Sequence, residues 1–211
     1  MIELKLRISF SSDWHCGSGL GESHLADAVL NRDTDGILMI PGRAVKGALR
    51  EGAWRLSALG GDYKEAERRL FGSVPYGEAI QQAGLLCVGP AELPEDIRTY
   101  FKNVSPGKRT REVSYMITRR ARTALQDGVA AHGSLRSLEC GIPGLTFVSS
   151  LSIDLPSSEK NWLLPYMSAV CAAVKSLGAD RARGLGRCTF QLVSENAPET
   201  PLPDLSAWRM K

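Results

Sequence analysis

The sequence predicts an α+β fold of the split βαβ, ferredoxin-like kind, in which a strand–helix–strand unit occurs twice. Two observations indicate this plan: apolar residues alternate with a period of two in well-separated stretches, and two other stretches repeat apolar residues at helical spacing. A third observation is a basic segment between the two halves, with too few apolar residues for a core of its own. The plan alone names no function, because many unrelated activities share it.

The first half begins with a strand in which apolar residues alternate strictly with charged or polar ones. The apolar set is Ile2, Leu4, Leu6, Ile8 and Phe10. In chain order we then expect a Gly/Ser-rich loop at 11–24, a short hairpin turning at "DTDG", a helix from Gly42 to about Leu59, a second helix at 63–71, a flexible connection at 72–79 and a buried strand at 84–89. Pro41-Gly42 marks the break before the first helix.

The second half repeats this order. Alternation resumes from Leu145 to Leu155, an amphipathic helix spans 164–177 with Gly178 as its left-handed cap, and a last strand alternates from Cys188 to Leu192. We therefore expect one domain at 1–193 with a basic insertion at about 98–140. A Pro-rich polar tail follows at 194–211.

Composition excludes several classes of protein. The 211 residues are 43% hydrophobic and 23% charged, which is ordinary for a globular protein. No apolar run approaches a membrane span, and the first ten residues lack the layout of a signal peptide, so we expect a cytoplasmic protein without a membrane partner. The five cysteines are widely spaced without a CxxC pair, which indicates reduced thiols and argues against a structural zinc site.

The segment "GADRARGLGR" at 178–187 is the strongest candidate for anion binding. Its glycines leave no side chains over the backbone amides, and its arginines present forks that suit phosphate. No Gly-Lys-Ser/Thr follows and the loop leads into a strand, so it is neither a P-loop nor a dinucleotide-binding fingerprint. A glycine-capped turn with solvated arginines is the alternative. The candidate residues are Arg181, Arg183, Gly184, Gly186 and Arg187.

Two further basic surfaces fit a polyanion. Arg43, Lys46 and Arg50 place a positive charge at nearly every turn of the first helix, where the helix dipole disfavours cations. A bound phosphate explains that arrangement, although a solvated basic face is the alternative. The insertion holds seven Lys/Arg between 102 and 122 against one acid, and its few aromatic residues favour backbone contact over base stacking. Its candidates are Lys108, Arg109, Arg111, Arg119 and Arg120.

The candidates for acid–base chemistry are few. His15, His24 and His132 form no metalloprotease pattern, and no GxSxG elbow is present. Asp27 lies just before an apolar strand arm, where a turn-stabilising role is the plainer interpretation. No group of residues with metal-ligand spacing occurs.

Taken together, "SDWHCGSGLG", "IPGRAVKGALR", "LFG", "REVSYMITRRARTAL", "GSLRSLECGIPGLTF" and "GADRARGLGR" resemble the RAMP superfamily of CRISPR effector proteins in order and spacing. More narrowly, the chain is similar to the repeated backbone subunit of type III, RNA-targeting complexes. The likeness runs from about residue 1 to 193. Val29, and Ala26 before the aspartate, depart from the usual pattern around Asp27.

The resemblance implies an RRM-like core with an inserted thumb, whose copies stack along a guide RNA and kink the guide–target duplex. It assigns guide-RNA contacts to His15, Arg43, Lys46, Arg50 and the arginine loop, and the thumb to residues near 103–125. Asp27 corresponds to the aspartate that cleaving members need to cut target RNA. Its carboxylate would either hold Mg²⁺ or another divalent cation or accept the hydroxyl proton, and the sequence leaves both roles open. The implied partners are guide RNA, target RNA, further copies of the chain and other effector subunits.

Three other readings stay open at this point. The chain is a non-cleaving scaffold of the same complex, or a guide-precursor endoribonuclease that uses His15 or His24, or an unrelated ferredoxin-like anion-binding domain.

Overall fold

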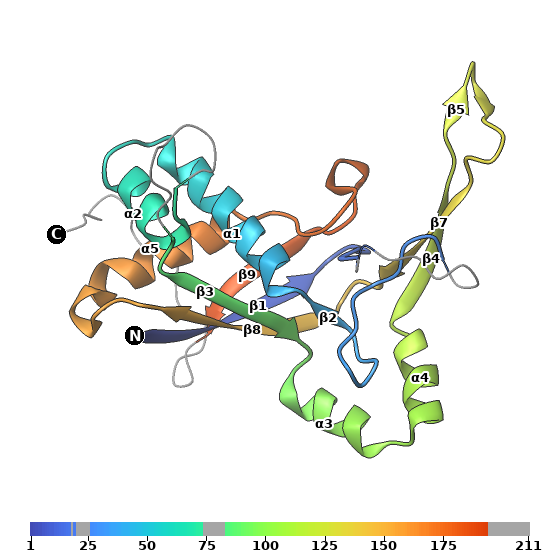
Figure 1. Ribbon diagram of the computed structural model, residues 1–211, viewed down its shortest axis with the longest axis horizontal. Helices are drawn as coiled ribbons and strands as arrows, with labels where there is room; N and C mark the ends of the chain where they lie inside the picture. Colours follow the sequence, from blue (N-terminus) through green and yellow to red (C-terminus); the bar gives the residue numbers. More distant parts are fainter. Residues whose placement is uncertain (18, 20–25, 74–82, 194–211) are drawn as a thin grey trace.

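A five-stranded antiparallel sheet forms the centre of the protein, in the order β2-β3-β8-β1-β9 (Figure 1). The computed structural model describes residues 1–17, 19, 26–73 and 83–193. The strands are β1 (Ile2–Phe10), β2 (Met39–Ile40), β3 (Leu86–Glu92), β8 (Thr146–Ile153) and β9 (Cys188–Val193). Without the short β2, each strand–helix–strand unit encloses a strand of the other unit, which confirms the ferredoxin-like plan.

Three helices cover one face of this sheet: α1 (Gly42–Ser57), α2 (Asp62–Phe71) and α5 (Lys160–Ala173). Helix α1 buries Val45, Leu49 and Ala53 against the sheet, and it packs on α2 and α5. Gly52 permits the close approach to α5, because a Cβ there would lie 2.7 Å from the carbonyl oxygen of Val170.

The core lies between these helices and the sheet. Leu6, Ile8 and Phe10 of β1 are almost fully buried, as are Phe147 of β8 and Phe190 of β9. Each such side chain contributes about 1.5–3 kcal/mol through burial. The apolar residues that alternate along these strands therefore face the core, as the sequence pattern predicted.

The opposite face of the sheet is open and polar. Lys5 and Arg7 of β1, Ser150 of β8, and Thr189 and Gln191 of β9 are exposed. Among the described strand residues, the aromatic side chains are all buried on the helix-covered face. The described strands of the open face therefore lack the stacking aromatics with which RRM sheets bind bases.

The insertion connects β3 to β8 and projects from the sheet (Figure 1). Its elements are α3 (Glu95–Asn103), α4 (Pro106–Ser114), β4 (Ile117–Arg122), β5 (Leu125–Gln126), β6 (Val129–Ala130) and β7 (Arg136–Gly141). β4 pairs with β7 and β5 with β6, so the insertion ends in a long antiparallel hairpin. We call residues 95–141 the thumb.

The predicted hairpin around "DTDG" is present but short. The amide of Asp33 donates to the carbonyl of Ile37 at 2.9 Å, and Arg32 bridges to Leu38. Asp33 also stabilises the turn, because its Oδ1 accepts hydrogen bonds from the amides of Asp35 and Ile37.

The predicted end of the second amphipathic helix was wrong. α5 ends at Ala173, and Val174 is already extended. The following residues pair with the far end of the arginine loop: Ser176 bridges to Arg187, and the amide of Leu177 donates to Gly186. Gly178 has a φ of +100° but belongs to this pairing and caps no helix.

Within the described residues, no helix has the length and apolar character needed to cross a membrane. His24, the Pro-rich tail at 194–211 and most of the connection predicted at 72–79 lie outside the described residues.

Candidate functional site

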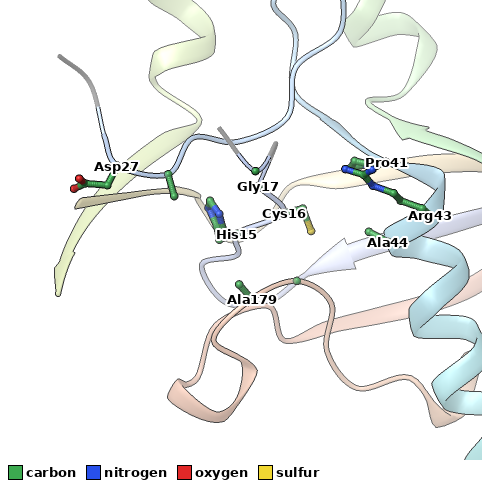
Figure 2. Close-up of a pocket in the computed structure, with 11 residues that line it drawn as sticks. His15, Cys16, Gly17, Asp27, Pro41, Arg43, Ala44 and Ala179 are labelled. Atoms are coloured by element: carbon green, nitrogen blue, oxygen red, sulfur yellow. The ribbon is translucent and has the colours of Figure 1, made fainter. Parts of the chain in front are cut away.

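A hollow of about 380 Å³ lies where four separate segments of the chain meet. Its lining comes from the segment after β1, the segment around Asp27, the start of α1 and the beginning of the arginine loop. Figure 2 shows Asp27 and Arg43 at opposite ends of it, with His15 and Cys16 between them. The lining residues that carry polar or reactive side chains are His15, Cys16, Asp27 and Arg43.

Asp27 is exposed and is held by one residue of the thumb strand β7. Its Oδ2 accepts a hydrogen bond from the amide of Ser137 at 2.6 Å and from the Ser137 hydroxyl at 3.1 Å. The backbone amide of Asp27 in turn donates to Ser137 Oγ. These hydrogen bonds, with the charge of Arg136, hold the pKa of Asp27 below its ordinary value. The carboxylate is therefore ionised at neutral pH.

The segment that carries Asp27 is fixed to β7 by a partly buried ion pair between Arg32 and Glu139. Glu139 of β7 is 3% exposed, and Nη2 of Arg32 lies 2.9 Å from its Oε2 and 3.2 Å from its Oε1. The amide of Leu30 donates to the same carboxylate. Ala28 forms a parallel bridge with Leu138 between these two anchors.

His15 forms the buried wall of the hollow. Its Nδ1 lies 2.6 Å from the carbonyl oxygen of Glu139, and its backbone carbonyl accepts a hydrogen bond from Ala179. The ring also fills the space beside Gly17, where a Cβ would lie 2.4 Å from Nε2. Cys16 beside it is buried, and burial raises the pKa of its thiol to about 12, so this cysteine is no thiolate nucleophile.

The three cations of α1 do not act together as the sequence suggested. Arg43 is exposed and lines the hollow. The ammonium of Lys46 donates to the carbonyl of Leu86 at 2.6 Å, and Arg50 donates to the carbonyl of Gly72 and lies 3.5 Å from Glu67. Only Arg43 is directed to the hollow, because the helix turns the other two toward β3 and α2.

The glycines of the arginine loop serve the packing of the loop itself. A Cβ at Gly186 would lie 2.1 Å from the carbonyl oxygen of Leu177, and one at Gly178 would lie 2.3 Å from that of His15. The amides of Gly184 and Gly186 donate to the carbonyls of Arg181 and Asp13. The prediction that these amides are free for an oxyanion was therefore wrong.

The arginines of this loop lie between α1 and the thumb. Arg181 donates to Glu51 of α1 at 2.5 Å, and Asp180 forms an ion pair with Arg122 of β4. Arg183 is 71% exposed and lies 3.7 Å from Asp180. The early basic helix and the late arginine loop are thus neighbours.

The thumb cations divide into structural and exposed groups. Arg109 donates to the backbone and carboxylate of Asp35, and Arg120 donates to Asp13 at 2.8 Å, so both tie the thumb to the body. Lys108 lies over the ring of Tyr100 and near Glu112, and Arg111 donates to the hydroxyl of Tyr115.

Among the predicted anion-binding arginines, three are exposed and have side chains without a hydrogen bond or ion pair to any other described residue. One lies on α1, one on β4 and one at the end of the arginine loop: Arg43, Arg119 and Arg187. Of the predicted anion-binding arginines, these are the ones that the described structure leaves available.

In the described part of the chain, the hollow offers a metal ion one carboxylate ligand, Asp27. Across residues 1–17, 19, 26–73 and 83–193, no three His, Cys, Asp or Glu side chains are grouped to hold a metal ion. Asp27 has Oδ1 without a described hydrogen-bond partner, so it offers one ligand. Mg²⁺ is commonly bound through one or two carboxylates together with phosphate oxygens and water, and Asp27 fits that mode only when a phosphate is present.

Sequence reasoning missed the residues that build the site around Asp27. Ser137, Glu139, Asp13 and Asp180 received no role, although each holds a candidate residue or its segment. One signal was available: Glu139 stands between Leu138 and Cys140 in a strand, and a carboxylate among buried neighbours needs a cationic partner.

Solved structures of similar fold share little sequence with this chain. A chain of the type III-B Cmr-β complex, determined by cryo-EM in the apo state, has a TM-score of 0.68 and 14% identity, over 92% of this chain and 98% of that one. A chain of Cmr-β bound to cognate target RNA has a TM-score of 0.68 and 14% identity, over 91% and 97%. A chain of a type IV-B CRISPR complex has a TM-score of 0.60 and 16% identity, over 98% and 97%. At such identities the likeness shows the fold alone.

A comparison with curated protein sequences gives no match. The family model described as RAMP superfamily matches residues 7–189, from β1 through the thumb to β9. Since that match spans most of the sequence and both halves of the ferredoxin-like core, the chain belongs to the RAMP superfamily.

Proposed function

We propose that this chain is a subunit of a CRISPR effector complex that binds guide RNA and cuts bound target RNA at Asp27. The observation that carries the proposal is the hollow in which Asp27, Arg43 and the arginine loop meet. Membership of the RAMP superfamily and the likeness to chains of Cmr-β and type IV-B complexes support it.

The guide strand would follow the exposed arginines. Arg43 lines the hollow, whereas Arg187 and Arg119 lie outside its lining, on the arginine loop and the thumb. A sugar-phosphate backbone that meets all three would therefore extend beyond the hollow. Guanidinium forks suit phosphate oxygens, and contacts of this kind give sequence-independent affinity. A guide must be held without regard to its sequence, which matches this chemistry.

Asp27 suits a cut that uses the RNA's own 2′-hydroxyl. The carboxylate is exposed and ionised, and its Oδ1 is available either to accept the hydroxyl proton or to hold a divalent ion such as Mg²⁺ with phosphate oxygens. The 2′-oxygen would form a bond to the neighbouring phosphorus while the bond to the 5′-oxygen breaks. The products are a cyclic phosphate and a 5′-hydroxyl end.

The partners that follow from the proposal are guide RNA, target RNA, further copies of this chain and other effector subunits in the cytoplasm. The test of RNA binding is to purify the protein with its associated factors and to sequence the RNA that accompanies it. Guides derived from CRISPR repeats are expected. Random cellular RNA, or none, would contradict the assignment.

The test of cleavage is Asp27→Ala in the assembled complex. We expect loss of target cleavage with guide and target affinity nearly unchanged, because Asp27 contributes no positive charge. Cleavage that persists in this variant would remove Asp27 from the reaction. A wild-type complex that binds target and never cuts it would establish the non-cleaving scaffold instead.

The guide-precursor endoribonuclease has weaker support. It requires His15 or His24 to exchange a proton with RNA. His24 lies outside the described residues, and the ring of His15 is buried with its Nδ1 2.6 Å from the carbonyl oxygen of Glu139. Cleavage of repeat RNA by the lone subunit without metal would favour that function.

A further inference from the structure

We infer that thumb strand β7 positions the Asp27 carboxylate for cleavage, with the Ser137 hydroxyl and the Glu139 carboxylate as positioning groups. The inference rests on the proposed cleavage function and adds to it the residues that aim the reacting group.

The contact between Asp27 and Ser137 is reciprocal. Ser137 donates its amide and its hydroxyl to Oδ2 of Asp27, and Ser137 Oγ accepts the amide of Asp27. One carboxylate oxygen is therefore fixed by two donors from one residue. The other oxygen, Oδ1, is left to face the solvent and a ligand.

The second anchor lies two residues further along β7. The ion pair between Arg32 and Glu139 ties down the far end of the Asp27 segment, and the amide of Leu30 donates to the same carboxylate. Between the anchors, the amide of Ala28 donates to the Ser137 carbonyl and the amide of Glu139 donates to the Ala28 carbonyl. The backbone of the segment is thus paired with β7 at Ala28, while Leu30 and Asn31 pair with Gly17 and Cys16.

The apolar contacts of Ala28, next to Asp27, lie near the base of the thumb, whereas Leu30 of the same segment belongs to the main core. Ala28 packs against a small cluster of Leu138, Cys140 and Leu185, which is separate from the main core between the sheet and the helices. Asp27 is therefore attached to the thumb more directly than to the central sheet. A displacement of β7 would carry the carboxylate with it.

The charged groups around Asp27 determine how its titration can be tested. Arg136 approaches from β7, while His15 and Arg43 line the same hollow from the segment after β1 and from α1. The hydrogen bond from the Ser137 amide is the largest cause of the low pKa of Asp27, and the hydrogen bond from the Ser137 hydroxyl is the second. Loss of the Ser137 hydroxyl should therefore raise this pKa while the surrounding charges stay in place.

The experiment compares Ser137→Ala with Ser114→Ala in the assembled complex. Ser114 is a matched control, because it is also a thumb serine whose hydroxyl makes one hydrogen bond, to the carbonyl of Arg111, away from Asp27. We expect Ser137→Ala to slow target cleavage about tenfold, as for one lost hydrogen bond to a charged group. Guide and target affinity should not change, and Ser114→Ala should cleave like wild type.

Two further measurements distinguish a positioning role of Ser137 from a general loss of structure in the variant. The acid limb of the cleavage pH profile should move to higher pH in Ser137→Ala, and Ser137→Thr, which keeps the hydroxyl, should restore both rate and profile. Carbon-13 NMR of the full chain, with the Asp27 signal assigned through Asp27→Asn, should show a higher pKa for Asp27 in Ser137→Ala alone.

Each outcome bears on one proposal. An unchanged rate, pH profile and Asp27 pKa in Ser137→Ala would overturn the positioning inference while Asp27-dependent cleavage stands. Wild-type cleavage that survives Asp27→Ala, or no wild-type cleavage, would overturn the proposed reaction and with it the positioning role.

Discussion

At the residue scale, Arg43 and Lys46 lie within one turn of α1 and meet different partners. Arg43 is exposed at the hollow, while the ammonium of Lys46 donates to the carbonyl of Leu86. Arg43 is therefore available to bind RNA, whereas Lys46 is held by the backbone of β3. Mutating each of them in turn compares the two situations on one helix.

Arg43→Ala should weaken RNA binding and reduce the slope of log affinity against log salt by about 1, as for one lost phosphate contact. Lys46→Ala should lower the free energy of unfolding, because it removes a hydrogen bond to the backbone, and should change RNA affinity much less. Fluorescence anisotropy over a salt series and denaturant unfolding measure the two effects. The same loss of RNA affinity in both variants would contradict the division.

At the element scale, the arginine loop is held by glycines whose surroundings differ. Gly184 and Gly186 both have positive φ, of +85° and +74°. A Cβ at Gly184 meets nothing within 4 Å, whereas one at Gly186 would lie 2.1 Å from the Leu177 carbonyl oxygen. Gly184 is therefore needed only for its positive φ. Gly186 is needed for its positive φ and also because a side chain there would clash with Leu177.

Gly184→Ala should therefore lower the free energy of unfolding by about 1–2 kcal/mol, the cost of a left-handed alanine. Gly186→Ala should cost clearly more, because the backbone of the loop must also move away from Leu177. Urea unfolding of the two variants measures the difference. Equal losses would show that Gly186 is not packed as described.

The ion pair between Glu51 and Arg181 joins the loop to α1, and its contribution depends on pH. The hydrogen bond from Arg181 is the main cause of the lowered pKa of Glu51, with Arg55 adding to it. A lowered folded-state pKa means that the stabilisation is present above the ordinary pKa of glutamate and is lost as pH falls through the folded-state value.

Glu51→Gln should lower the Tm at about pH 7, and this difference should shrink toward about pH 3. Both side chains are partly exposed, so we expect no more than about 1 kcal/mol. Thermal unfolding at the two pH values measures it. A difference that grows on acidification would have the wrong sign for this pair.

The elements were predictable from sequence where one face of an element is buried. Alternation located β1 and β9, and helical spacing located α1, because burial imposes a period on the side chains. The end of α5 was not predictable, since it depends on pairing between Leu177 and Gly186. Long-range pairing of this kind leaves no period in the sequence.

The sequence predicted which residues belong to the candidate site. It did not predict which of them are free to bind RNA and which are held by partners within the protein. Asp27 and Arg43 do line one hollow, yet Arg50 and Arg109 carry the same charge and are held by internal partners. Whether an arginine is available depends on which carboxylate or carbonyl the fold brings to it. Sequence spacing alone does not contain that information.

At the scale of the whole molecule, the arginine loop connects the ferredoxin-like core to the thumb. Arg181 reaches Glu51 of α1 on one side, and Asp180 reaches Arg122 of β4 on the other. The start of α1 and the beginning of the arginine loop line the hollow, and Asp27, which also lines it, is held by β7 of the thumb. The open face of the sheet lies elsewhere and carries no described aromatic strand residue.

The central claim is that RNA lies along the hollow between α1, the arginine loop and the thumb, and not across the open sheet. Ultraviolet crosslinking of the assembled complex, followed by mass spectrometry of peptide–nucleotide adducts, tests it most directly. The account predicts adducts on peptides that contain Arg43, residues 178–187 and β4. Adducts confined to the exposed residues of β1 and β9 would contradict it.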